Sequence, residues 1–77
     1  MLRLLVLGGS QGARRLNQGV PAALAQAGAE GIEVRHQAGS AGFQATRADY
    51  AARGIAAEVE AFIADMAEAY AWADLVI

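Results

Sequence analysis

The residues best suited to chemistry follow an apolar run near the start of the chain. Residues 4–7 (Leu-Leu-Val-Leu) lead into Gly-Gly-Ser-Gln-Gly at 8–12, and a helix is predicted to begin near residue 12. Glycines let the backbone turn tightly and approach a ligand closely. A helix that opens beside them directs unpaired N–H groups and its positive dipole end into the loop. Together with the hydroxyl of Ser10, this pattern favours binding of a phosphate or diphosphate.

The loop matches neither of two common phosphate-binding motifs. The chain contains no lysine, so the Gly-Lys-Ser/Thr ending of a P-loop is absent, and the glycine spacing is not GxGxxG. The second apolar run ends in His36 and Gln37 rather than in the acidic residue that would hold a ribose. A tight strand-to-helix turn without a ligand therefore stays open beside anion binding.

Candidate catalytic and metal-binding groups are sparse. His36 is the single histidine and stands at a strand end, where it could act as a general base or contact a phosphate. We favour a hydrogen-bonded structural histidine, because no partner for catalysis is apparent and a metal site needs more ligands. Ser10 has no local base that would make it a nucleophile. We expect no metal site, no resident cofactor and no catalytic residue in this chain.

The elements that must position these residues follow from the apolar pattern. We predict strands at residues 2–7, 32–37 and 57–62, and a fourth strand from Leu75. The first helix should pack through Leu16, Val20, Leu24 and Ala27, with a kink or a restart at Pro21, which lacks an N–H.

A second helix is predicted over residues 43–53, with Phe43, Tyr50 and Ala51 inward and Gly54 at C′. A third helix should run to about residue 72, with Asp65 as its N-cap and Glu68 at N3.

Strands and helices that alternate with short connections indicate an α/β fold with a Rossmann-like parallel sheet and helices on both faces. Such sheets bind ligands beyond the carboxyl ends of their strands. Residues 8–12, 36–39 and 62–66 should meet at that edge. A nucleotide could lie there with its phosphates at the first loop and its base near the third, where Phe62 would either form an apolar wall for the base or close the core.

Composition limits the class of protein. The chain has 77 residues, a net charge of −2, six dispersed arginines and no cysteine. These values argue against a nucleic-acid partner and a disulfide framework, and no segment is long enough to span a membrane. The chain opens on a core strand and stops within an apolar run at 75–77, so we expect one partial domain, residues 1–77, without an internal boundary.

Several motifs, in this order and spacing, resemble the MurG family of bacterial glycosyltransferases. The matching stretches are Leu-Gly-Gly-Ser-Gln-Gly-Ala-Arg at 7–14, Leu-Asn at 16–17, Val-Pro at 20–21, His-Gln-x-Gly at 36–39, Tyr50, Phe-Ile-x-Asp-Met-Ala at 62–67 and Ala-Tyr-Ala-Trp-Ala-Asp at 69–74. The resemblance implies a GT-B architecture of two Rossmann-like domains. This chain would be the first part of the C-terminal, donor-binding domain.

The resemblance also implies an activity and a set of binding residues. Members of the family are inverting enzymes that transfer N-acetylglucosamine from UDP-N-acetylglucosamine to lipid I, forming lipid II for the peptidoglycan of the cell wall. The serine of the glycine loop contacts the donor diphosphate, and the Phe-Ile-x-Asp-Met segment faces the uracil, with backbone groups of the isoleucine at the base edge. The residues that carry over are Gly9, Ser10, Gln11, Gly12, Phe62, Ile63 and Met66.

Other functions of the family belong to its N-terminal domain. By resemblance, that domain binds lipid I, carries the acid or base, and contacts the cytoplasmic face of the bacterial inner membrane as a peripheral protein. This chain alone should bind the donor weakly and catalyse nothing. Two positions depart from the family pattern: Ser40 stands where a lysine is frequent, and Ala64 replaces a frequent acid.

Two alternatives to a piece of one enzyme stay open. The chain could be the donor-binding subunit of a split glycosyltransferase that works beside a membrane-anchored partner. It could also be a free-standing nucleotide-binding module of flavodoxin-like type. The unfinished strand at residue 77 argues against the second alternative.

Overall fold

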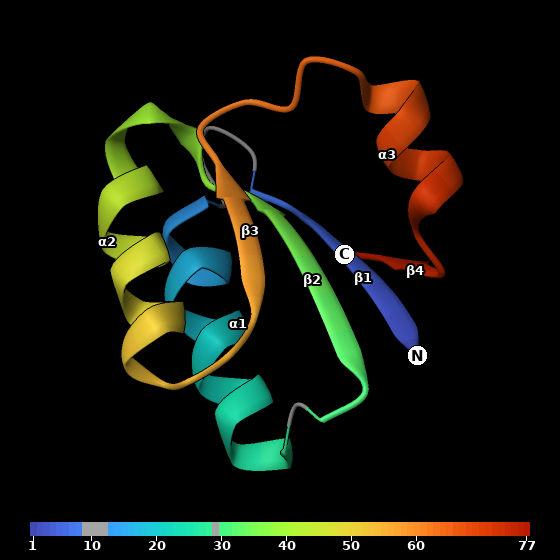
Figure 1. Cartoon of the computed structure of the whole chain (residues 1–77). Helices are drawn as coiled ribbons and strands as arrows, with labels where there is room; N and C mark the ends of the chain where they lie inside the picture. The colour runs from blue at the N-terminus through green and yellow to red at the C-terminus, as the bar shows by residue number, and fades with distance from the viewer. Residues whose placement is uncertain (9–12, 29) are drawn as a thin grey trace.

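The chain alternates strands and helices along its whole length. The computed structural model describes residues 1–8, 13–28 and 30–77. The elements are β1 (Leu2–Leu7), α1 (Ala13–Ala27), β2 (Ile32–Gln37), α2 (Gly39–Ala52), β3 (Ala57–Glu60), α3 (Met66–Trp72) and β4 (Leu75–Val76). The strands form one parallel sheet in the order β3-β2-β1-β4 (Figure 1). The predicted α/β class with a parallel sheet is therefore confirmed.

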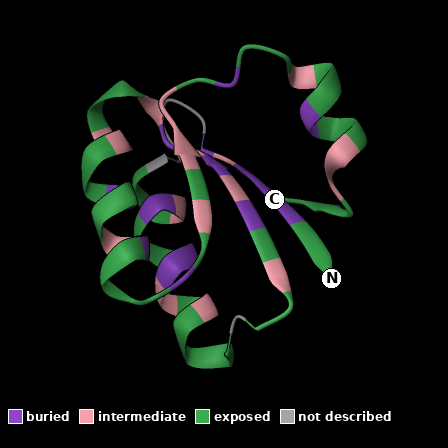
Figure 2. Cartoon of the chain, in the orientation of Figure 1, coloured by how far each residue is buried: buried purple, intermediate pink, exposed green. Residues whose placement is uncertain are grey.

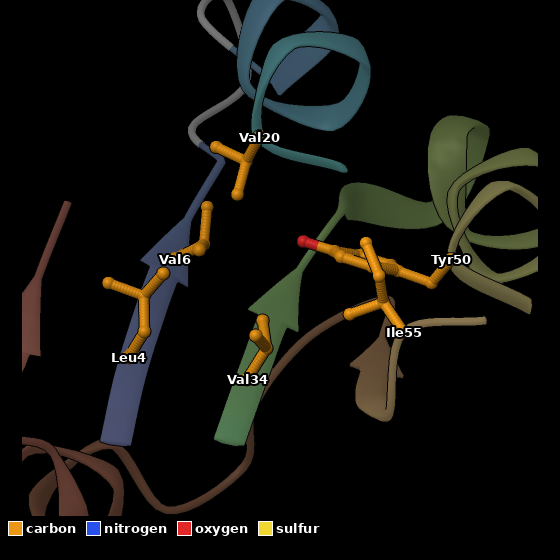
Figure 3. Close-up of a cluster of buried hydrophobic side chains, with 6 residues drawn as sticks. All are labelled: Leu4, Val6, Val20, Val34, Tyr50 and Ile55. Atoms are coloured by element: carbon orange, nitrogen blue, oxygen red, sulfur yellow. The ribbon is translucent and has the colours of Figure 1, made fainter. Parts of the chain in front are cut away.

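Helices cover both faces of this sheet. On one face, Leu4 and Val6 of β1 pack with Val34 of β2 against Val20 of α1 and Tyr50 of α2 (Figure 3). On the other face, Leu5 forms a cluster with Ile63 and with Ala69 of α3. Alternate residues of a strand point to opposite faces, so β1 must be apolar on both sides. Figure 2 accordingly shows the buried residues along the middle of β1 and β2.

Several local predictions are confirmed. The bounds of β1 and β2 are those read from the apolar runs, and β4 begins at Leu75. The side chain of Asp65 caps α3, with Oδ1 accepting a hydrogen bond from the N–H of Glu68 at 3.0 Å. Gly54 has a φ of +70°, as a glycine that ends a helix often does.

The structure differs from the prediction for α1 at two points. The helix runs from Ala13 to Ala27, so the restart at Pro21, one of the two predicted outcomes, does not occur. Pro21 is buried, and Leu16, Val20 and Leu24, on both sides of it, pack against the sheet. Ala27 was expected to face inward and is exposed. It is the last residue of the helix, at the end that extends past the sheet in Figure 1.

The second helix and third strand also differ from their predicted bounds. α2 begins at Gly39 rather than at residue 43, although Gly39-Ser40-Ala41-Gly42 has the composition of a loop. The N–H of Gly39 donates to the carbonyl of Ala61 at 2.9 Å, which fixes this end beside β3. Thr46 and Tyr50 form the buried side of α2, so Ala51, predicted inward, faces solvent. β3 ends at Glu60, two residues early, because the chain bends at 61 and 62.

Candidate functional site

The carboxyl ends of β1, β2 and β3 meet at one edge of the sheet. The N–H of Gly8 donates to the carbonyl of Gln37 at 2.9 Å, and the N–H of Ala38 donates to the carbonyl of Glu60 at 2.8 Å. The first of these bonds places Gly8, the start of the predicted segment 8–12, next to the predicted segment 36–39. Gly9, Ser10, Gln11 and Gly12, the predicted phosphate-binding residues, lie outside the described residues.

A pocket of about 760 Å³ opens at this edge, between α1 and α2. Among the described residues, its lining includes Gly8, Asn17, Gln37, Gly39, Thr46 and Phe62. Arg14 of α1 and Asp49 of α2 add one charge of each sign. Backbone, amide, hydroxyl and aromatic groups thus face one concave site, as in many small-molecule pockets.

The floor between α1 and α2 is a buried hydrogen-bond network centred on His36. This residue is 1% exposed. Its Nδ1 lies 2.7 Å from the hydroxyl oxygen of Tyr50, and its Nε2 lies 2.7 Å from Oδ1 of Asn17. Asn17 Nδ2 donates to the carbonyl of Ala38 at 2.9 Å. The three side chains connect α1, β2 and α2 directly behind the pocket.

The network indicates the tautomer of the neutral histidine. Because Asn17 presents its amide oxygen, which can only accept, His36 Nε2 carries the proton and donates. Nδ1 is then unprotonated and accepts a hydrogen bond from Tyr50. Burial lowers the pKa of His36 to about 4, so the ring is neutral at pH 7. Burial, and to a smaller extent the Asp49 carboxylate, raise the pKa of Tyr50 well above its usual value. The predicted structural role of His36 is confirmed.

The three residues predicted to face a base lie differently. Phe62 lines the pocket and is 69% exposed, so it does not close the core. Ile63 is 7% exposed and packs with Leu5 on the opposite face of the sheet, where Met66 also lies against the cluster. The structure therefore brings the side chain of Phe62 to the pocket, whereas Ile63 and Met66 are not among the residues that line it.

Gln37 is a contact residue to which the sequence analysis gave no role. Its Oε1 accepts a hydrogen bond from the N–H of Ile63 at 2.8 Å, and the residue also lines the pocket. The available signal was its place in the His-Gln-x-Gly motif. The spacing of that motif does not reveal a partner 26 residues away.

A charged cluster on the α3 face supports the segment that carries Phe62. The Arg35 side chain is 12% exposed, and its Nη1 donates to both carboxylate oxygens of Glu68 at 3.1 Å. Its guanidinium also lies 5.3 Å from the centre of the Trp72 ring, close enough for a cation–π interaction. Glu58 and Glu60 of β3 are within 3.9 Å. These contacts connect β2 and β3 to α3.

Among the described residues there is neither a metal-binding group nor a membrane-spanning helix. Within residues 1–8, 13–28 and 30–77, no three or more His, Cys, Asp or Glu residues form a group that could hold a metal ion. In the same part of the chain, no helix combines the length and the apolar character needed to cross a bilayer.

Relatives with curated names match almost the entire chain. A protein of Xanthomonas axonopodis pv. citri is 60% identical over 76 residues, and one of Aeromonas hydrophila has the same identity over the same length. Both are named UDP-N-acetylglucosamine–N-acetylmuramyl-(pentapeptide) pyrophosphoryl-undecaprenol N-acetylglucosamine transferase. Each match includes 99% of this chain but 18% and 21% of the relative, so the chain spans about a fifth of their length.

A solved structure agrees with the sequence matches. The crystal structure of Acinetobacter baumannii MurG superposes with a TM-score of 0.83 and 40% sequence identity, over 97% of this chain and 23% of that one. A family sequence model, the glycosyltransferase family 28 C-terminal domain, matches residues 3–77. The chain therefore belongs to the glycosyltransferase family 28 C-terminal domain family.

Proposed function

We propose that this chain supplies donor-binding structure to an N-acetylglucosaminyltransferase that converts lipid I to lipid II in peptidoglycan synthesis. The observation that carries the proposal is the 60% identity to named transferases over 99% of the chain. The pocket at the carboxyl ends of β1 to β3 supports it, because open parallel sheets bind nucleotides at this edge. Residues 1–77 would be part of one donor-binding domain, without an internal boundary.

The proposed reaction inverts the anomeric centre. The 4-hydroxyl of the muramyl sugar attacks the anomeric carbon of UDP-N-acetylglucosamine, its proton passes to a base, and the bond to the diphosphate breaks. UDP leaves as a β-1,4 linkage forms. The role of this chain is to hold the nucleotide and to stabilise the negative charge on the departing diphosphate. The positive dipole end of α1, at its N-terminus, favours that charge. The acid or base would be supplied outside these residues.

We assign the donor contacts in two groups. Gly9, Ser10, Gln11 and Gly12 would surround the diphosphate, and Phe62, Ile63 and Met66 would form the side of the site next to the uracil. For the second group, the exposed ring of Phe62 on the pocket and the position of Ile63 next to it support the assignment.

The partners of the whole enzyme follow from the same proposal. The donor is UDP-N-acetylglucosamine, and the acceptor is lipid I, which would bind a domain outside this chain. That domain would also contact the cytoplasmic face of the bacterial inner membrane, where the enzyme would act as a peripheral protein. We propose no metal or other cofactor in the part of the site formed by this chain.

A backbone amide NMR titration with UDP tests the donor assignment, with ADP as the control ligand. We expect UDP to shift the amide signals of residues 8–12 and 62–66 more strongly than ADP at the same concentration, because the two nucleotides share a diphosphate and differ in the base. Equal shifts with both nucleotides would remove the uracil assignment. No shift with either would overturn donor binding by this chain.

Two serine variants test whether the diphosphate binds at the glycine loop or elsewhere in the pocket. Ser10→Ala should weaken the response to UDP, because it removes the hydroxyl proposed to contact the diphosphate. Ser40→Ala removes a hydroxyl from the pocket lining at the start of α2 and should leave UDP binding almost unchanged. The reverse order would place the diphosphate at α2 and contradict the assignment of Ser10.

A further inference from the structure

Gln37 contacts both halves of the proposed donor site. It is the last residue of β2, the strand between β1 and β3 in the sheet. Its carbonyl accepts a hydrogen bond from the N–H of Gly8, where the glycine loop begins, at 2.9 Å. Its side-chain Oε1 accepts from the N–H of Ile63, in the segment assigned to the base, at 2.8 Å.

The two contacts differ in how far they depend on the side chain. The bond from Gly8 continues the parallel ladder of β1 and β2, which any residue could supply. After the end of β2, the ladder with β3 continues through the bonds from Ala38 to Glu60 and from Gly39 to Ala61. The chain then bends, so the N–H of Ile63 is held by a side-chain oxygen and not by β2 backbone.

The bond to Ile63 has no simple substitute. Ile63 is 7% exposed, and a buried N–H that loses its partner carries a full desolvation penalty. The orientation of this peptide also sets the direction of Phe62, the neighbouring residue, whose ring reaches the pocket. Fixing the N–H of Ile63 therefore fixes the position of the aromatic wall relative to Gly8.

We propose that Gln37 is a positioning residue that holds the segment of Phe62 and Ile63 at a fixed place relative to Gly8, and thereby supports the preference for uracil over a purine. This inference rests on the proposed donor-binding function. If the bond to Ile63 were lost, Phe62 could move away from the face of the base, so the contribution of the base to binding, and with it the preference for uracil, would fall.

Two substitutions isolate the side-chain acceptor. Gln37→Leu keeps a similar volume and removes the oxygen, whereas Gln37→Glu keeps an oxygen that can accept from Ile63. Gln44→Leu is the matched control, because Gln44 is exposed on α2. The same amide titration with UDP and ADP is run on each full chain, and the signal of the Ile63 N–H is first compared without ligand.

We expect Gln37→Leu to shift the free Ile63 signal and to weaken UDP binding about tenfold, the factor that one lost hydrogen bond of about 1.4 kcal/mol produces. ADP binding should change less, so the preference for UDP falls. Gln37→Glu should restore most of the preference for UDP over ADP, although its negative charge in the pocket weakens the binding of both nucleotides. Gln44→Leu should match the parent chain. A general loss of structure would instead weaken the binding of both nucleotides equally, and Gln37→Glu would not restore it.

Separate results overturn the inference and the proposed function. If the parent chain prefers UDP and Gln37→Leu keeps the same affinity and preference, then Gln37 does not position the site and donor binding stands. If Gln37→Leu weakens UDP and ADP equally, its effect is structural and the inference is wrong. If the parent chain does not prefer UDP, the proposed uracil site fails, and the role of Gln37 fails with it.

Discussion

The His36 ring is hydrogen-bonded on both sides and buried, an environment that favours its neutral form. Nε2 donates to Asn17 and Nδ1 accepts from Tyr50. A second proton on Nδ1 would face the Tyr50 hydroxyl, which would have to turn its own hydrogen away. Burial adds the cost of placing a positive charge away from water. The residue therefore resists protonation in the folded chain.

Stability should consequently fall as the pH falls from about 6.5 to 4. Burial lowers the pKa of His36 from 6.5 in the unfolded chain to about 4 in the folded chain. Within this window the unfolded chain binds a proton that the folded chain does not, so the free energy of unfolding rises with pH and His36 accounts for about 3 kcal/mol. Urea unfolding at several pH values measures the change.

The single histidine gives this prediction a direct control. The imidazole Cε1–H signal of the chain can come only from His36. We expect its NMR shift to stay constant from pH 7 to 5 in the folded chain. Titration with a midpoint near 6.5 would show that the ring is accessible and would contradict the structural role.

Alanine substitutions at two glycines inside helices should change the free energy of unfolding in opposite directions. A Cβ at Gly42 of α2 would clash with Nδ2 of Asn17, whereas a Cβ at Gly19 of α1 would meet nothing within 4 Å. We expect Gly42→Ala to cost about 1–3 kcal/mol through overpacking and Gly19→Ala to stabilise by about 0.5–1 kcal/mol through helix propensity. Denaturant unfolding compares them, and equal effects would mean that α1 and α2 do not approach closely at Asn17.

At the residue scale, the sequence predicted the role of His36 but not that of Gln37. A histidine without nearby ligands or bases is most simply explained as a structural group, and that conclusion needs no knowledge of its partners. The role of Gln37 depends on the bend after β3, which brings the N–H of Ile63 toward its side chain. The apolar pattern instead indicated a strand through residue 62, so this contact could not be anticipated.

Among the elements, α3 depends most on side chains outside itself. It has seven residues, too few for a stable isolated helix. Asp65 caps its first turn, Ala69 packs beneath it, and Arg35 of β2 binds Glu68 and lies over Trp72. Because α3 follows the segment that contains Phe62 and Ile63, its anchorage also holds one side of the proposed site.

Removing Arg35 should therefore loosen α3 specifically. We expect Arg35→Ala to cost about 2 kcal/mol, since its bonds to Glu68 are charge-assisted and the guanidinium is largely buried. Arg53→Ala is the matched control, because Arg53 pairs with Asp49 at the surface of α2 and such a pair contributes about 0.5 kcal/mol. Amide hydrogen exchange should accelerate in α3 with the first variant only. Unchanged exchange there would show that Arg35 does not anchor the helix.

The bounds of the elements were predictable where one strong signal determines them. The apolar runs of β1 and β2 and the Asp65 cap are local signals, and their predictions hold. The start of α2 is set by contacts between elements, since Gly39 bonds to Ala61 and Gly42 leaves room for Asn17. Without knowledge of these contacts, the two glycines within residues 39–42 indicate a loop.

At the scale of the whole molecule, the two edges of the sheet differ in chemistry. β3 carries Glu58 and Glu60, and such charges discourage pairing with another strand. β4 carries Leu75 and Val76, which are both exposed, on the other edge. The sequence predicted a parallel sheet but not that β4 pairs with β1 opposite β2, because apolar periodicity identifies strands without identifying their neighbours.

This difference predicts self-association through β4. The two residues of β4 are apolar and exposed, and an edge strand without charges can pair with a second chain, so the apparent mass of this 77-residue chain should rise with concentration. Leu75→Lys should suppress the rise by placing a charge on the edge. Tyr70→Lys adds the same charge at an exposed apolar residue of α3, away from the edge, and should leave the association unchanged. Light scattering coupled to size-exclusion chromatography measures the mass, and equal suppression by both variants would indicate a general effect of charge rather than pairing at β4.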